Sequence, residues 1–330
     1  MSFALQPTLP APLRKLVATL KTNTPAVGVF WGVVTAMCFG LMAVFAHAAS
    51  ATMPSQHVLF WRSIVSLVMI APFAYQHLPA ILRHPVHHGG LWLRSGVSAV
   101  SVCILFLNIA HLGAAPASLL IDTSLVMIVL YRVLIQRLPL HLWQWVALGL
   151  VLLGNVALQL PSVAATSSSA GLGSHQQALW GLGLVGAALA AVSFVQLNTL
   201  SVRYPSSTIL LAYLIAIIPC ALVPQQVWLP ALTSGHSAWA WPTLAQAGLL
   251  LGLGLASTAN QLTLTACYKR LTASMAGMVV MTGVVWAGLW DALLLGVRFS
   301  PEELACYAVI LSGLAVLKAV KPTHLVNTAR

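Results

Sequence analysis

AHLGAAPASLLIDTSLVMIVLYRVLIQR (residues 110–137) is an apolar run with one carboxylate, Asp122, near its start. A second run, ACYKRLTASMAGMVVMTGVVWAGLWDALLLGVR (residues 266–298), has the same plan, with Asp291 as its one carboxylate. Three identities lie at one common offset: Ala110, Ala117 and Ser118 correspond to Ala266, Ala273 and Ser274. This match predicts that one half-molecule is used twice in the chain.

The segments that follow the two runs also correspond. Each run is followed by a short turn that contains a proline, Pro139 or Pro301. Each turn leads into another apolar run with a glycine near its middle, Gly154 or Gly313. The order of the elements therefore supports the repeat beyond the three identities.

The composition predicts a protein that lies in a lipid bilayer. Of the 330 residues, 59% are hydrophobic and only 6% are charged, and the mean hydropathy is +0.93. A soluble core cannot hide that much apolar surface. The net charge of +11 comes from basic residues that stand singly between apolar runs. Because they form no cluster with interleaved aromatic residues, we expect no nucleic-acid partner.

The cysteines and acidic residues limit the chemistry that the chain can perform. All five cysteines fall inside apolar runs, without a CxxC motif or the spacing of zinc ligands. We therefore expect no disulfide, no metal site and no other cofactor. The chain has only four acidic residues. A membrane-embedded enzyme would need paired acids, a histidine–carboxylate pair or a metal set, so we expect no catalytic residues.

Ten runs of about 20 apolar residues are long enough to cross a bilayer core of about 30 Å. They cover residues 26–48, 57–76, 91–112, 116–136, 141–160, 178–200, 206–226, 243–265, 272–296 and 302–320. A segment rich in Ser, Gly and Ala separates five spans from five. The predicted parts are a leader at 1–25, a first repeat at 26–160, a linker at 161–177, a second repeat at 178–320 and a tail at 321–330. Since each repeat has five spans, the second enters the membrane from the opposite side.

The lysines and arginines predict that both termini are cytoplasmic. With this orientation every Lys and Arg lies on the inner side except Arg298, which faces outward, and Arg62, which lies within a span. Positive residues concentrate in cytoplasmic loops of membrane proteins. The prediction is a multi-pass protein of an inner or plasma membrane, with an extracytoplasmic linker between the repeats.

Several short pieces carry a resemblance to a known family. They are GLMAVFAHA (40–48), PSQHVLFWRS (54–63), LRSG (93–96), ACYKRLTAS (266–274) and MTGVVWAG (281–288). In order and spacing they resemble the EamA-type branch of the drug/metabolite transporter superfamily. The resemblance implies an all-α membrane protein of ten transmembrane helices, arranged as two inverted five-helix repeats. It also implies a small-molecule substrate.

The chain departs from the pattern of this family at several positions. His47 stands where relatives commonly have Lys, Leu125 where they have Pro, and Met281 where a Tyr is expected. The identity of the substrate therefore does not follow from a better-known relative, and loss of transport stays open as an alternative.

Three ionisable residues lie in the outer third of the predicted spans: Arg62, Asp122 and Asp291. Arg62 matches an arginine of the resembled family. A lone charge at this depth is costly, so each group is expected to pair, bind a cation or carry a proton. One interpretation is an ion pair between Arg62 and Asp122 that closes the outer side. The alternatives are static scaffolding, or an Arg62 side chain that extends to the headgroups.

Uncharged polar and aromatic residues are further candidates for the wall of a cavity or gate. They are Asn108, Gln196, Asn198, Thr258, Asn260, Gln261, Thr265, Trp31, Trp286, Trp290, Phe106 and Tyr213, together with His47, which is expected to supply a pH-dependent positive charge near the outer end of its span. Hydrogen bonding between helices and ordinary packing are the alternatives for each.

Together these features predict a secondary transporter that moves a small organic metabolite by alternating access. An amino acid, a nucleotide-like or a drug-like compound would fit this prediction. Coupling to a proton or another ion, and a homodimer, stay open. The alternatives are a transport-inactive or channel-like scaffold of the same fold and, further from the composition, a membrane-embedded enzyme.

Overall fold

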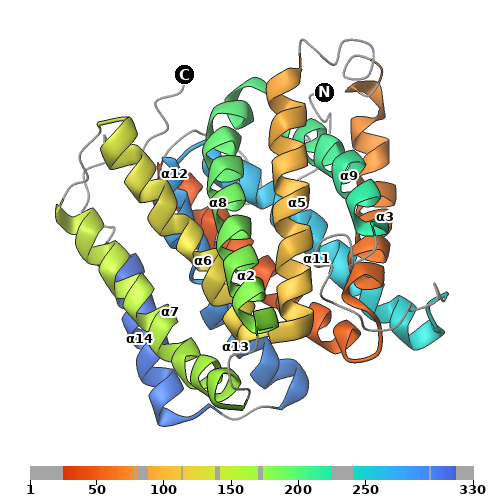
Figure 1. Cartoon of the computed structure of the whole chain (residues 1–330). Coiled ribbons are helices and arrows are strands. Elements are labelled where there is room, and N and C mark those ends of the chain that lie inside the picture. The colour runs from red at the N-terminus through yellow and green to blue at the C-terminus, as the bar shows by residue number, and fades with distance from the viewer. Residues whose placement is uncertain are drawn as a thin grey trace, which may run out of the picture.

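The structure is a computed structural model, and it describes residues 25–77, 79, 88–112, 114–137, 142–169, 174–223, 241–296 and 299–316. All regular elements in these ranges are helical (Figure 1). The predicted leader, apart from Pro25, and the predicted tail lie outside the described residues. The elements are α2 (Pro25–Ser50), α3 (Ser55–Ala74), the 3-10 turn η1 (Tyr75–His77), α5 (Gly89–Leu112), α6 (Ala114–Leu130), the π-helical turn η2 (Tyr131–Ile135), α7 (Leu142–Ser169), α8 (Ser174–Arg203), α9 (Ser206–Leu222), α11 (Leu244–Tyr268), α12 (Ala273–Val280), α13 (Gly283–Leu295) and α14 (Pro301–Val316).

The prediction of ten spans is confirmed within the described ranges. Nine of the ten predicted spans each correspond to one of these α-helices. The remaining span, predicted at residues 272–296, holds both α12 and α13. Eight spans are long and apolar enough to cross a membrane, and α9 is a shorter apolar helix. The starts of several helices follow from proline, whose fixed φ angle and missing N–H suit the first turn. Pro54 and Pro205 directly precede α3 and α9, and Pro301 is the first residue of α14.

Two predicted boundaries are corrected by the structure. The segment 161–177 is not a free linker along most of its length, because α7 continues to Ser169 and α8 begins at Ser174. The segment begins with Pro161 inside α7, and the Ser and Ala residues that follow permit the helix to continue, since the next Pro or Gly is Gly171. The ninth span is interrupted at Met281 and Thr282, between α12 and α13. There the Thr282 hydroxyl donates to the Val279 carbonyl at 2.7 Å, which tightens the turn.

The helices of the two halves interlock. In the first half α2 packs on α11 and α13, and α3 packs on α11; in the second half α8 packs on α5 and α6, and α9 packs on α5. Each helix of the first half has an equivalent in the second half: α2 corresponds to α8, α3 to α9, α5 to α11, and α6 to α12 and α13. Replacing every helix by its equivalent converts the first set of contacts into the second. The contacts of α3 with α9 and of α7 with α14 convert into themselves. This is the pattern that a two-fold relation between two five-helix units produces.

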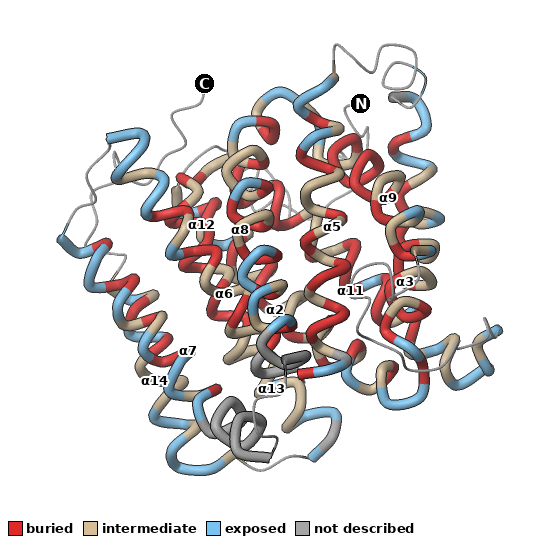
Figure 2. Tube along the Cα trace, in the orientation of Figure 1, coloured by how far each residue is buried: buried red, intermediate tan, exposed pale blue. Residues whose placement is uncertain are grey.

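Buried and exposed residues alternate along the helices (Figure 2), and many of the exposed residues are large and hydrophobic. Figure 1 shows α7 and α14 side by side at one edge of the bundle, with α3 and α9 toward the opposite edge. Leu153 and Leu160 of α7 and Leu304 and Leu311 of α14 are exposed. Exposed leucines in this number are expected where lipid, and not water, covers the surface.

The two glycines that the repeat predicted lie in the contact between α7 and α14. A Cβ atom on Gly154 would come within 2.5 Å of the Ile310 side chain and 3.1 Å of the Cys306 carbonyl oxygen. A Cβ atom on Gly313 would come within 3.0 Å of the Ala147 carbonyl oxygen. Small residues let helix backbones approach closely in a membrane, so both glycines serve the same crossing from opposite sides.

We expect Gly154→Leu and Gly313→Leu each to lower the free energy of unfolding by about 1–3 kcal/mol, since both overfill this crossing. Thermal unfolding of the purified protein in detergent measures the change. Gly149→Leu is the matched control, because a Cβ atom at Gly149 on the same helix meets no atom within 4 Å in the described chain. An equal loss of stability in the control would contradict the assignment of these glycines to the crossing.

Candidate functional site

A small cavity lies between α3, α5 and α9. Its wall consists of Ser55, Gln56 and Leu59 from α3, Cys103, Phe106 and Leu107 from α5, and Cys220 and Ala221 from α9. The first two helices belong to the first predicted repeat and the third to the second. The cavity is therefore built between the halves, at the N-terminal end of α3 and the C-terminal end of α9.

Arg62 lies next to this cavity, one helical turn beyond Leu59. Its side chain is only 3% exposed, and its guanidinium carbon lies 5.2 Å from the centre of the Phe106 ring. Nη2 donates a hydrogen bond to the Tyr213 hydroxyl at 3.0 Å, and Nη1 contacts the Met42 sulfur at 3.7 Å. Nε has no hydrogen-bond partner among the described residues. One donor of the guanidinium is thus left unused beside the cavity wall.

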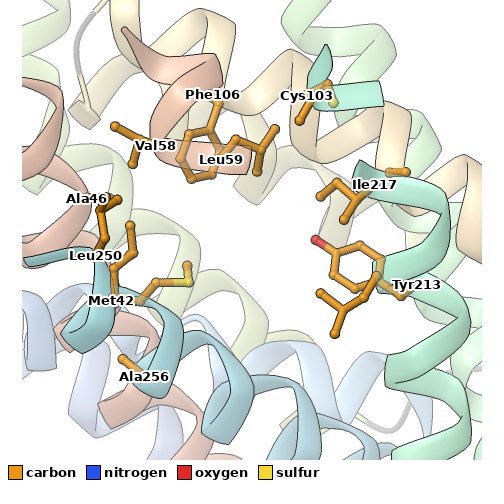
Figure 3. Close-up of a cluster of buried hydrophobic side chains, with 14 of the residues drawn as sticks. Met42, Ala46, Val58, Leu59, Cys103, Phe106, Tyr213, Ile217, Leu250 and Ala256 are labelled. Carbon is orange, nitrogen blue, oxygen red and sulfur yellow. The ribbon is translucent and has the colours of Figure 1, made fainter. Parts of the chain in front are cut away.

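Tyr213 of α9 joins Arg62 to a second buried arginine. Figure 3 shows the Tyr213 hydroxyl directed toward the interior of the cluster, with Phe106 and Met42 among the surrounding side chains. Arg94 of α5 is 2% exposed and lies within electrostatic range of the same phenol. In the described chain neither Nε nor Nη1 of Arg94 has a hydrogen-bond partner. Two guanidinium groups therefore lie in the protein interior around one tyrosine.

Comparison with known proteins shows which family the first half of the chain resembles. A model described as the EamA-like transporter family matches residues 26–158. This part of the chain is similar to that family. The resemblance predicted from the short sequence pieces is thus confirmed, and the described helices form the fold of an EamA-type membrane transporter.

Similar proteins extend the match beyond the first half. A pseudopaline exporter of Pseudomonas aeruginosa (strain UCBPP-PA14) is 27% identical over 268 residues, which are 81% of this chain and 87% of that protein. An uncharacterized transporter of Helicobacter pylori (strain J99) is 24% identical over 91% of this chain and 99% of that protein. A crystal structure of a protein that is 16% identical superposes with a TM-score of 0.71, covering 89% of this chain and 97% of the other, and shows the shared fold.

The structure separates the three charged residues that the sequence grouped together. The ion pair predicted between Arg62 and a carboxylate is absent, because Nη2 bonds to Tyr213, Nη1 contacts Met42 and Nε has no partner among the described residues. The alternative interpretation, in which the Arg62 side chain extends to the lipid headgroups, is also wrong, since Arg62 is buried. Asp122 of α6 lies beside Gln159 of α7, and Asp291 of α13 lies near His47 of α2. The outer gate made of this trio is therefore not formed in this structure.

The polar candidates divide between structural contacts and a second cavity. Asn198 donates through Nδ2 to the carbonyl oxygens of Tyr268 and Leu271, at 2.7 and 2.8 Å, and so holds the turn after α11. Asn108 lines a second, smaller cavity between α5, α6 and α8. Its Oδ1 has no partner within the part of the chain that is described.

The remaining candidates lie apart from the larger cavity. Asn260 is buried with an unpartnered Oδ1 in the described chain, and its neighbour Gln261 is half-buried. Trp31 packs edge to face on Phe30. Trp286 lies where the backbone of α13 crosses α2. None of these four residues, nor His47, contributes to the described wall of the larger cavity.

Sequence reasoning missed several residues at the site. Arg94 was interpreted as a topology signal because it lies near the start of its span. The only feature of the sequence that pointed to a buried arginine was its position a few residues inside that span. Cys103 and Cys220 face each other across the cavity wall, from α5 and α9. No spacing in the sequence relates these two cysteines, since their pairing depends on how α5 packs on α9.

Proposed function

We propose that this chain is a secondary transporter that carries a small organic metabolite by alternating access. The cavity between α3, α5 and α9 is its route to a central site at Arg62 and Tyr213. The observation that carries the proposal is the position of this cavity between the two halves, next to a buried cation with an unused donor. Transporters built from inverted repeats bind their substrates at such an interface.

The exchange of the two halves also suggests what moves during transport. The cavity is formed by α3, α5 and α9. The equivalent helices under this exchange are α9, α11 and α3, which form a second set. In the present structure α3 and α11 of this second set are in direct contact: Gly254 of α11 packs against Val65, and the Ser66 hydroxyl donates to the Gly254 carbonyl oxygen at 3.2 Å. We infer that the opposite conformation opens here and closes the cavity. The contact between α3 and α9 is common to both states.

The named relatives agree with transport more than with the alternatives. The transport-inactive scaffold and the channel keep the same fold, so only a measurement of exchange separates them from a carrier. For this chain we propose an inner or plasma membrane location, with the cavity on the extracytoplasmic side as the distribution of Lys and Arg predicts. Pseudopaline is the first single compound to test, because a relative is named as its exporter.

Counterflow in proteoliposomes tests the proposal. Vesicles filled with an unlabelled bacterial metabolite extract are placed in a uniformly ¹³C-labelled extract, and the labelled compounds that enter are measured by mass spectrometry. We expect a small set of compounds to enter with saturable kinetics, at a rate at least about tenfold above that of protein-free vesicles.

A blocking variant and a matched control sharpen this test. Gln56 lies at the mouth of the cavity, where its Nε2 donates to the Val223 carbonyl oxygen at 2.6 Å. Gln56→Trp should fill the mouth and stop exchange, whereas Gln76→Trp, an exposed site beyond the other end of α3, should not. Saturable exchange that Gln56→Trp leaves unchanged would contradict this route. Non-saturable flux would indicate a channel, and no exchange would indicate a scaffold.

A further inference from the structure

We propose that the substrate is a small organic anion, and that Arg62 and Arg94 bind its carboxylate oxygens. The inference rests on the proposed transport function, and it names the substrate class of that same site. It begins from the burial of three groups in one cluster. Arg62 is 3% exposed, Arg94 2% and Tyr213 1%.

The charge of these two arginines is not balanced within the chain. Its four side-chain carboxylates, Asp122, Asp291, Glu302 and Glu303, all lie in the described ranges. None of them forms an ion pair with Arg62 or Arg94. A buried charge without a counter-charge is costly, and in transmembrane segments such charges mark substrate or ion pathways.

Three donors of these two arginines are unused. They are Nε of Arg62 and both Nε and Nη1 of Arg94, none of which has a hydrogen-bond partner in the described chain. The planar guanidinium group matches the two oxygens of a carboxylate and forms paired, charge-assisted hydrogen bonds with it. An entering carboxylate would satisfy these donors and neutralise the cation in one step.

Phe106 connects Arg62 to the cavity, and Tyr213 relates Arg62 to Arg94. Phe106 is part of the cavity wall and also lies under the Arg62 guanidinium. The Tyr213 hydroxyl accepts from Arg62 and lies within electrostatic range of Arg94, so the tyrosine interacts with both guanidinium groups. Leu59, Phe106 and Leu107 line the entrance. This apolar lining favours an organic acid with a carbon skeleton over an inorganic phosphate or sulfate ion, which has the same oxyanion chemistry.

Thermal unfolding of the whole purified protein in detergent tests the inference without requiring transport. The probes are a panel of mono-, di- and tricarboxylic acids, among them succinate and citrate, each beside its neutral methyl ester. Inorganic phosphate and sulfate at matched ionic strength form a separate arm. We expect at least one acid to raise the melting temperature, and its ester, phosphate and sulfate to have little effect.

Three variants show where the acid binds. Arg62→Gln and Arg94→Gln should each weaken the apparent affinity for that acid about 10- to 100-fold, as the loss of a charge-assisted hydrogen bond predicts. Arg62→Lys should recover only part of the loss, since it keeps the charge and not the planar group. Arg132→Gln is the control, because Arg132 is a partly buried arginine whose Nη1 donates elsewhere, to the Ser274 hydroxyl at 2.9 Å.

Several results would overturn the inference. They are stabilisation by the esters as large as by the acids, a response to phosphate or sulfate alone, no response to any acid, and an unchanged response in both Arg62→Gln and Arg94→Gln. The proposed function fails separately. Saturable exchange of neutral or cationic compounds alone would keep the transporter and reject the anion, whereas binding of acids without any exchange would keep the site and reject transport.

Discussion

Arg94→Met is expected to raise the melting temperature of the ligand-free protein and to abolish exchange. Arg94 is buried, and two of its nitrogens have no hydrogen-bond partner in the described chain. Replacing buried charges with an apolar side chain of similar volume is often stabilising, by about 1–4 kcal/mol. The same replacement removes half of the proposed anion site. Stability gained together with function lost is the signature of a residue kept for its activity.

Differential scanning fluorimetry and counterflow on the same preparation measure both effects of Arg94→Met. Arg62→Met provides the comparison, because it leaves the buried Tyr213 hydroxyl without its donor and removes the contact with Phe106. We expect this variant to lose exchange and to gain less stability than Arg94→Met, or to lose stability. A lower melting temperature for Arg94→Met would show that Arg94 stabilises the fold, and unchanged exchange would remove it from the site.

Gly40→Ala is expected to have the largest effect on folding. A Cβ atom at Gly40 would lie 2.5 Å from the backbone nitrogen of Ala287 and 2.8 Å from the backbone carbonyl carbon of Trp286. Backbone atoms cannot rotate away as a side chain can, so α2 and α13 would have to separate. We expect a loss of about 3 kcal/mol or more, the upper part of the range for overpacked sites. Size-exclusion chromatography and thermal unfolding of the membrane extract measure the result.

Gly181→Ala is the control for this prediction. Gly181 lies on α8, and a Cβ atom there meets no atom within 4 Å in the described part of the chain. Because alanine favours a helix over glycine, by up to about 1 kcal/mol, this control should be neutral or slightly stabilising. A folded, monodisperse Gly40→Ala protein with an unchanged melting temperature would refute the close crossing of α2 and α13.

The number and type of the elements could be predicted because they depend on local properties. Crossing a bilayer requires about 20 apolar residues, and only a helix satisfies every backbone group within such a span. The repeated Gly154 and Gly313 were also visible in the sequence, and both lie at the crossing of α7 and α14. The break at Met281 and Thr282 was not predicted. The hydropathy of the span does not change there, and the turn depends on the Thr282 side chain and on how α13 packs against α2.

The site could be predicted only in part. Burial depth along the chain selected Arg62, and the aromatic candidates included Phe106 and Tyr213, which the structure brings together with it. Asp122 and Asp291 were equally strong candidates, because depth in the membrane does not say which way a side chain faces around its helix. Arg94 lies only five residues inside its helix, so it resembled a charge at the membrane boundary.

By itself the sequence determined that this protein has ten spans in two equivalent sets, because hydrophobic length and repeated residues are properties of the chain. Only the tertiary structure decided which charges remain without a partner. Arg62 and Tyr213 are 151 positions apart and meet because α3 packs on α9, whereas the carboxylates are held on other helices, beside Gln159 and His47. The rotation of each helix about its axis sets these contacts, and it follows from the packing of all the helices together.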